Sequence, residues 1–104
     1  MSKQYHKLVR DRIPEIIART GKTCCTQKLD DQAYLRLLDE KLGEELAEYQ
    51  ESESLEELAD LLEVMEAVVT ARGYTWEQLQ MIKTEKKVAR GGFENKILLL
   101  EVSE

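Results

Sequence analysis

The sequence predicts an all-α fold built on an antiparallel helical hairpin. Apolar residues recur at helical spacing along two consecutive stretches, helix-capping residues precede each stretch, and the turn between them is short and polar. One proline and five glycines, with 42% hydrophobic and 35% charged residues, suit a soluble helical protein. We expect residues 1–104 to form a single domain whose core is a hairpin of about residues 30–51 and 54–72.

A short helix is expected before the hairpin. Pro14 suits the first turn of a helix and Gly21 suits its end, which predicts a helix over residues 14–20. The preceding segment Arg10-Asp11-Arg12 is then a loop. Its charges fit either a surface ion-pair cluster or a group that reaches into a phosphate site.

The first long helix is expected to start at Asp30 or Asp31, either of which can cap it, and to run to about Glu51. Glu45 falls inside the apolar stripe of this helix and Glu48 lies at the edge of the stripe, whereas Glu44 points elsewhere. The stripe consists of Leu35, Leu38, Leu42, Leu46 and Tyr49.

The second long helix is expected over residues 55–71, ending at Gly73. Glu57 and Asp60 project beside Val64 on its apolar side, whereas Glu56 and Glu63 lie on the solvent side. Its predicted buried face is broader than one partner helix would cover, which favours a homodimer or homotetramer that completes a four-helix-type bundle. That face consists of Leu55, Leu58, Leu61, Leu62, Met65, Val68 and Val69.

Negative charge is concentrated on this hairpin. Between Lys41 and Arg72 there are ten acidic residues and no lysine or arginine, while the whole chain carries a net charge of −6. In an antiparallel hairpin that turns near residues 51–54, Glu48 lies level with Glu57, and Glu45 lies level with Asp60, about one helical turn apart.

Such a carboxylate cluster needs a counter-charge. Two carboxylates about 4 Å apart repel each other by roughly 4 kcal/mol at an effective dielectric constant near 20. A hard divalent cation such as Mg²⁺, which prefers oxygen ligands and phosphate, would neutralise the four acids. The structural alternative is a capping box in which the Glu57 side chain bonds back to the start of its own helix at Ser54.

A third helix is expected from the capping box Thr75-Trp-Glu-Gln78 to about Arg90. Lys83, Lys86 and Arg90 fall on one face of this helix. They make either an ordinary solvated face or a surface that holds phosphates. Gly91-Gly92-Phe93 then breaks the helix, and residues 96–102 are expected to be extended.

Several classes of protein are disfavoured. No apolar run reaches membrane-spanning length, and net acidity without a continuous basic face argues against a duplex nucleic-acid binder. The adjacent Cys24 and Cys25 fit neither a zinc pattern nor a disulfide framework, which favours a reduced, cytoplasmic setting. A di-iron carboxylate bundle would need Glu-x-x-His motifs, and His6 is the only histidine.

Three sequence blocks resemble one enzyme superfamily. Glu45-x-x-Glu48 followed by Glu57-x-x-Asp60 is similar to the metal-binding signature of the MazG-like nucleoside triphosphate pyrophosphohydrolases, which are all-α. Residues 7–17 and the segment Arg90-Gly-Gly-Phe-Glu94 resemble a subgroup labelled phosphoribosyl-ATP pyrophosphohydrolase-like. The resemblance spans nearly the whole chain.

The resemblance implies a Mg²⁺-dependent cut between the α and β phosphates of a nucleotide, which releases a nucleoside monophosphate and pyrophosphate. It assigns Mg²⁺ binding to Glu45, Glu48, Glu57 and Asp60, with Glu44 and Glu45 as the doubled glutamate at the catalytic position, where a water oriented by metal or carboxylate attacks. The phosphate-binding candidates are Lys83, Lys86, Arg90, Arg10 and Arg12. The eight-residue gap between the two acidic motifs is short for this superfamily and leaves little room for a base-recognition loop.

Two alternatives remain open. One is phosphoribosyl-ATP hydrolysis in histidine synthesis, which shares the acidic motif. The other is a non-catalytic helical dimer that binds a nucleotide or a protein and carries its acids for solubility.

Overall fold

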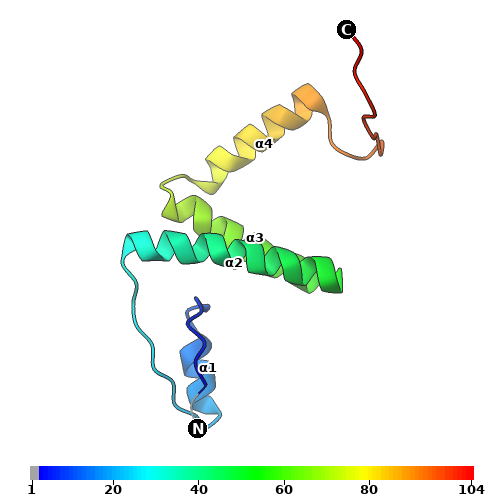
Figure 1. Ribbon diagram of the computed structural model, residues 1–104. Coiled ribbons are helices and arrows are strands. Elements are labelled where there is room, and N and C mark those ends of the chain that lie inside the picture. The colour runs from blue at the N-terminus through cyan, green and yellow to red at the C-terminus, as the bar shows by residue number, and fades with distance from the viewer. Residues whose placement is uncertain (1–2) are drawn as a thin grey trace.

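The computed structural model describes residues 3–104, and within that range the chain forms four α-helices and no strand. Along the chain these are α1 (Ile13–Arg19), α2 (Asp31–Ser52), α3 (Leu55–Ala71) and α4 (Trp76–Arg90) (Figure 1). The all-α prediction is confirmed, and each boundary lies within about one residue of its expected place.

The helix starts follow from their capping residues. The Asp30 side chain accepts a hydrogen bond from the Ala33 amide at 2.8 Å, which begins α2. A complete capping box of Thr75 and Gln78 begins α4. These bonds satisfy amides that have no partner inside the helix.

The start of α3 separates the two interpretations of Glu57. The Ser54 hydroxyl accepts a hydrogen bond from the Glu57 amide at 3.3 Å, as a capping box requires. The Ser54 amide, however, donates to the hydroxyl of Ser52 at 3.3 Å and not to the Glu57 carboxylate. The capping-box alternative is therefore wrong in its second half, and the Glu57 carboxylate is left for another role.

The hairpin of α2 and α3 is the centre of the fold. Glu53, in the left-handed conformation with φ 56°, ends α2 and lets the chain reverse into α3. The two helices then pack along each other, whereas α4 packs only against α3 (Figure 1). Leu38 of α2 and Val64 of α3 are the buried apolar residues among those described, at 2% and 8% exposure.

The expected buried face of α3 is only partly covered. Four residues of the expected face, Leu55, Leu58, Leu62 and Met65, are exposed, whereas Val64, which was not expected there, is buried. The reason is geometric: α2 covers one side of α3, and these four residues lie on another side. Their spacing of three, four and three residues is that of a helix–helix packing seam, which we call the α3 seam.

The chain is far from compact. Its radius of gyration is 18.6 Å, against about 13 Å for a compact domain of 100 residues. Figure 1 shows α1 below the hairpin, α4 projecting above it, and residues 91–104 leading away from the end of α4. Within the described range, no helix combines the length and the apolar character needed to span a membrane.

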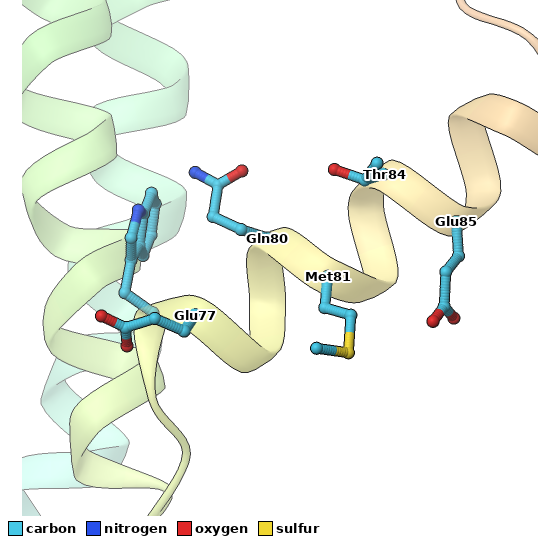
Figure 2. Close-up of a pocket in the computed structure, with 6 residues that line it drawn as sticks. Glu77, Gln80, Met81, Thr84 and Glu85 are labelled. Atoms are coloured by element: carbon cyan, nitrogen blue, oxygen red, sulfur yellow. The ribbon is translucent and has the colours of Figure 1, made fainter.

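The surface of α4 carries a shallow, open depression (Figure 2). Gln80 and Thr84 point to one side of the helix, and Met81 and Glu85 point to the other. A single helix cannot enclose a ligand, so this depression is an uncovered helix surface and not a nucleotide cleft. Its lining is completed by Trp76 and Glu77.

Candidate metal centre

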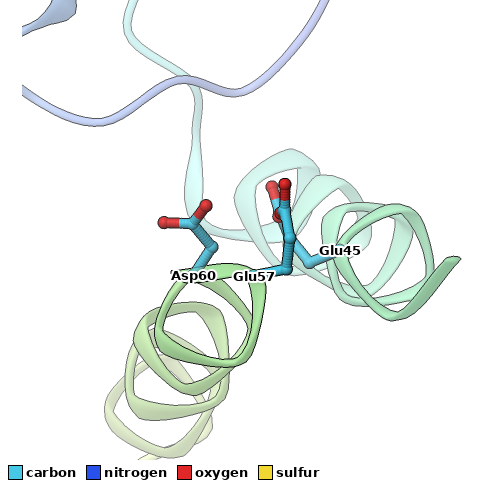
Figure 3. A group of neighbouring side chains, drawn as sticks. All are labelled: Glu45, Glu57 and Asp60. Carbon is cyan, nitrogen blue, oxygen red and sulfur yellow. The ribbon is translucent and has the colours of Figure 1, made fainter. Parts of the chain in front are cut away.

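Three of the acids predicted to bind metal converge on one side of the hairpin. Glu45 projects from α2, and Glu57 and Asp60 project from the first half of α3 (Figure 3). One carboxylate oxygen from each residue lies within 4.8 Å of the other two. Three oxygen atoms at such separations can share one cation.

Glu45 is the least ordinary of these acids because it is only 6% exposed. Its Oε2 is buried and has no hydrogen-bond partner among the described residues, and the same is true of Glu57 Oε2. A buried carboxylate oxygen without a partner is costly, since it has lost its hydration and gained nothing in return. Two such atoms therefore lie close together on the hairpin, at a place where carboxylate oxygens converge.

The carboxyl groups disfavour each other's charge. Burial raises the pKa of Glu45 above its ordinary value of 4.5, and the neighbouring Glu48 carboxylate raises it further, whereas Lys41 opposes the shift. Burial and the nearby Glu48 and Asp60 carboxylates likewise raise the pKa of Glu57. Burial and mutual repulsion therefore both disfavour the charged forms of these two carboxyl groups.

Basic side chains partly balance the cluster from outside. Lys41 Nζ lies 3.5 Å from Glu45 Oε1, one helical turn earlier on α2. The Arg10 guanidinium donates to Asp60 Oδ1 at 2.7 Å. Lys7 Nζ lies 2.8 Å from Glu44 Oε1, and this contact lowers the pKa of Glu44.

Glu44 and Glu48 flank the three converging acids. Glu48 is exposed, and its charge acts on both Glu45 and Glu57, so it lies beside them at the open edge. Glu44 is paired with Lys7 and is not part of the converging group. Glu48 therefore lies close to Glu57 across the hairpin.

The predicted phosphate-binding residues fall into two groups. Arg10 lies at the carboxylates, whereas Arg12 pairs with Glu15 of α1 at 2.8 Å. The basic face of α4 lies on a helix that projects away from the hairpin and contacts neither α1 nor α2 (Figure 1). Within one chain, Lys83, Lys86 and Arg90 form no ion pair with the four carboxylates.

Lys7 and Lys41 were not predicted as parts of the site. Lys41 precedes Glu45 by four residues, a spacing that brings side chains together on a helix, so its position could have been read from the sequence. Lys7 carries no such signal, because its contact with Glu44 depends on how the N-terminal segment returns to the hairpin.

Comparisons with known proteins give one partial match. A stretch of 42 residues is 52% identical to an uncharacterized protein of Mycolicibacterium smegmatis, covering 40% of this chain and 43% of that protein. The match thus spans less than half the length of that relative. No family model and no solved structure matches the chain.

Proposed function

We propose that this protein is a Mg²⁺-dependent nucleoside triphosphate pyrophosphohydrolase that cleaves between the α and β phosphates. The observation that carries the proposal is the buried Glu45 carboxylate, whose unpartnered oxygen lies in a group with Glu57 and Asp60. The reaction itself is inferred from the resemblance of the three sequence blocks to MazG-like pyrophosphohydrolases. The products are a nucleoside monophosphate and pyrophosphate.

The residues present fit magnesium. All the converging donors are carboxylate oxygens, without the nitrogen or sulfur that zinc or copper sites favour. In our proposal Glu45, Glu48, Glu57 and Asp60 hold the ion. Bound Mg²⁺ would supply a Lewis acid for the phosphate oxygens and lower the pKa of a water.

The protein's own residues then position the substrate. Arg10 and Lys41 already lie against the carboxylates, so a polyphosphate that enters the site meets two cations there. An arginine can bind two phosphate oxygens at once, and a lysine offers a point charge. Glu44 or Glu45 orients the attacking water in this proposal.

The basic face of α4 can contact a carboxylate cluster only if that cluster belongs to another chain. Since α4 projects away from its own hairpin, we infer that Lys83, Lys86 and Arg90 hold the phosphates bound by a second copy of the chain. The short gap between the acidic motifs leaves base recognition to the termini or to that second copy.

Removal of non-standard nucleotides in the cytoplasm is the role that we propose.

Self-association is supported by the exposed surface. The chain exposes 9852 Å², whereas a compact monomer of its 12.0 kDa mass exposes about 6,000 Å². The exposed residues of the α3 seam are part of this additional surface. Their spacing is that of a helix–helix packing seam. A homodimer or homotetramer with a four-helix core would bury it.

The decisive experiment incubates the protein with Mg²⁺ and a panel of standard and modified nucleotides, including phosphoribosyl-ATP, and assays pyrophosphate. We expect hydrolysis that EDTA abolishes and Mg²⁺ restores. If phosphoribosyl-ATP is the only nucleotide hydrolysed, the protein would instead be a phosphoribosyl-ATP pyrophosphohydrolase of histidine synthesis. Nucleotide binding without release of pyrophosphate would leave a non-catalytic binding protein.

Matched variants connect this activity with the carboxylates. Asp60→Asn keeps the side chain's shape but removes one charge, so it should abolish turnover while the helical circular dichroism stays unchanged. Glu63→Gln removes the same charge from an exposed position of α3 and should keep wild-type turnover. Full activity of Asp60→Asn and of Glu57→Gln would contradict the metal centre.

A further inference from the structure

The C-terminal arm, residues 96–102, is apolar and almost wholly exposed. Ile97, Leu98, Leu99 and Leu100 are consecutive, and each is between 74% and 85% exposed; Val102 is 77% exposed. Contiguous apolar surface of this kind is rare on monomeric soluble proteins and marks an interaction site.

The departure of the arm from α4 is structured. Gly91 ends α4 with φ +84°, a conformation that favours glycine, and its amide donates to the Lys87 carbonyl at 2.8 Å. A turn follows in which the Lys96 amide donates to the Phe93 carbonyl at 3.1 Å. These two turns direct the arm away from the helices of its own chain (Figure 1).

The arm has the character of a strand without neighbours. In the part of the chain that the structure describes, residues 97–102 make no backbone hydrogen bond. Successive side chains of an extended segment face opposite sides, so Ile97 and Leu99 face one way and Leu98 and Leu100 the other. Apolar residues on both faces are typical of a segment that is covered from two sides.

The chain's own helices do not cover the arm. The large exposed surface of the chain indicates that a second copy does. The exposed area exceeds that of a compact monomer by about 3,900 Å². Permanent dimers bury about 1,000–2,500 Å² on each chain, so the excess is sufficient for a large interface. A twofold assembly would bury two identical arms at once, since each chain gives one arm and receives one.

We propose that the C-terminal arm packs on a second copy of this chain, so that two chains exchange their arms. This interface is additional to the α3 seam. It rests on the proposed self-association but on no part of the proposed chemistry, so hydrolysis and arm exchange can fail independently.

The first test weakens the arm in the full-length chain. In the double variant Leu98→Asp, Leu100→Asp, analytical ultracentrifugation should show a dimer dissociation constant at least tenfold higher than wild type. The matched control Asn95→Asp, Ser103→Asp adds the same two charges on either side of the arm and should stay within about threefold. Equal dissociation constants for the two double variants, or a wild-type protein that is monomeric, would overturn the proposal.

The second test shows which chain receives the arm. A nitroxide label is attached at Ser103→Cys in chains that also carry Cys24→Ser and Cys25→Ser, and these chains are mixed with unlabelled chains enriched in ¹⁵N. Exchange predicts that the label broadens helix amide signals of the ¹⁵N chains. If the mixed sample shows no broadening at concentrations where dimers form, the arm covers its own chain and the proposal is wrong.

Discussion

Arg10 and Asp60, fifty positions apart in the sequence, are joined by a hydrogen-bonded ion pair of 2.7 Å. The pair ties the N-terminal segment to the carboxylate group on α3. It also places a positive charge where a metal ion would bind. In the proposed site a metal ion and Arg10 would therefore compete for the same carboxylate, and a displaced Arg10 would be available to a phosphate.

We predict that Arg10→Gln tightens Mg²⁺ binding, because the ion then has no internal cation to displace. Both side chains of the pair are about half exposed, and such pairs contribute at most about 1 kcal/mol. The dissociation constant for Mg²⁺ should fall by up to about fivefold in isothermal titration calorimetry. Turnover should fall in the same variant, because the phosphates lose one ligand.

Arg12→Gln is the matched control for this prediction. Arg12 lies two residues later but pairs with Glu15 on α1, not with the carboxylate group. Its removal should leave Mg²⁺ affinity unchanged. Equal affinities for the Arg10 and Arg12 variants would mean that the 2.7 Å pair does not oppose metal binding.

The stability of the metal-free protein should rise as the pH is lowered from neutral towards 4.5. The pKa values of Glu45 and Glu57 are raised above 4.5 in the folded state, so the folded protein binds more protons than the unfolded chain in this range. Below pH 4.5 the trend should reverse, because the pKa of Glu44 is lowered by Lys7. Urea denaturation across the pH range measures both slopes.

Saturating Mg²⁺ should change that profile. In the proposed site the ion would bind the charged carboxylates and release the protons that they held, so the stabilisation near pH 5 should shrink and the stability at pH 7 should rise. Identical pH profiles with and without Mg²⁺ would show that the two raised pKa values belong to a site that binds no magnesium.

Glu57→Gln should separate the structural role of this residue from its proposed role in binding metal. The Ser54 cap uses only the backbone amide of Glu57, which glutamine keeps. We expect an unchanged or higher free energy of unfolding without metal, together with loss of Mg²⁺-induced stabilisation. Glu56→Gln, on the exposed side, should leave both quantities at wild-type values. A destabilised metal-free variant would point to a structural role instead.

Much of the fold could be predicted because its signals are local. Asp30, Ser54 and Thr75 cap helices as their residue types indicate, and the direction of Glu45 within the apolar stripe predicts its burial. The convergence of Glu45, Glu57 and Asp60 needed only helical spacing and an antiparallel turn. The convergence of these acids depends on residues fewer than about twenty positions apart in the sequence.

The rest depends on contacts that local patterns do not encode. The apolar pattern of α3 indicated that its apolar face is broader than one helix covers, but not which of its residues α2 leaves exposed. The pairing of Arg10 with Asp60 and of Lys7 with Glu44 depends on how residues 3–12 return to the hairpin. The projection of α4 away from the carboxylates likewise has no signal in its own basic face.

The last prediction concerns the α3 seam. Leu62 is 44% exposed in one chain, so Leu62→Gln should change the stability of a monomer by only about 0.5 kcal/mol. Between two packed copies of α3 the same change removes buried apolar surface worth about 1.5–3 kcal/mol per chain. Since dimer stability depends on protein concentration, the wild-type melting temperature should rise with concentration, and that of Leu62→Gln should be lower and rise less steeply with concentration. Leu38→Ala, in the buried face between α2 and α3, should instead destabilise the hairpin by about 2–5 kcal/mol at every concentration. A wild-type melting temperature that does not change with concentration would exclude the seam as an interface.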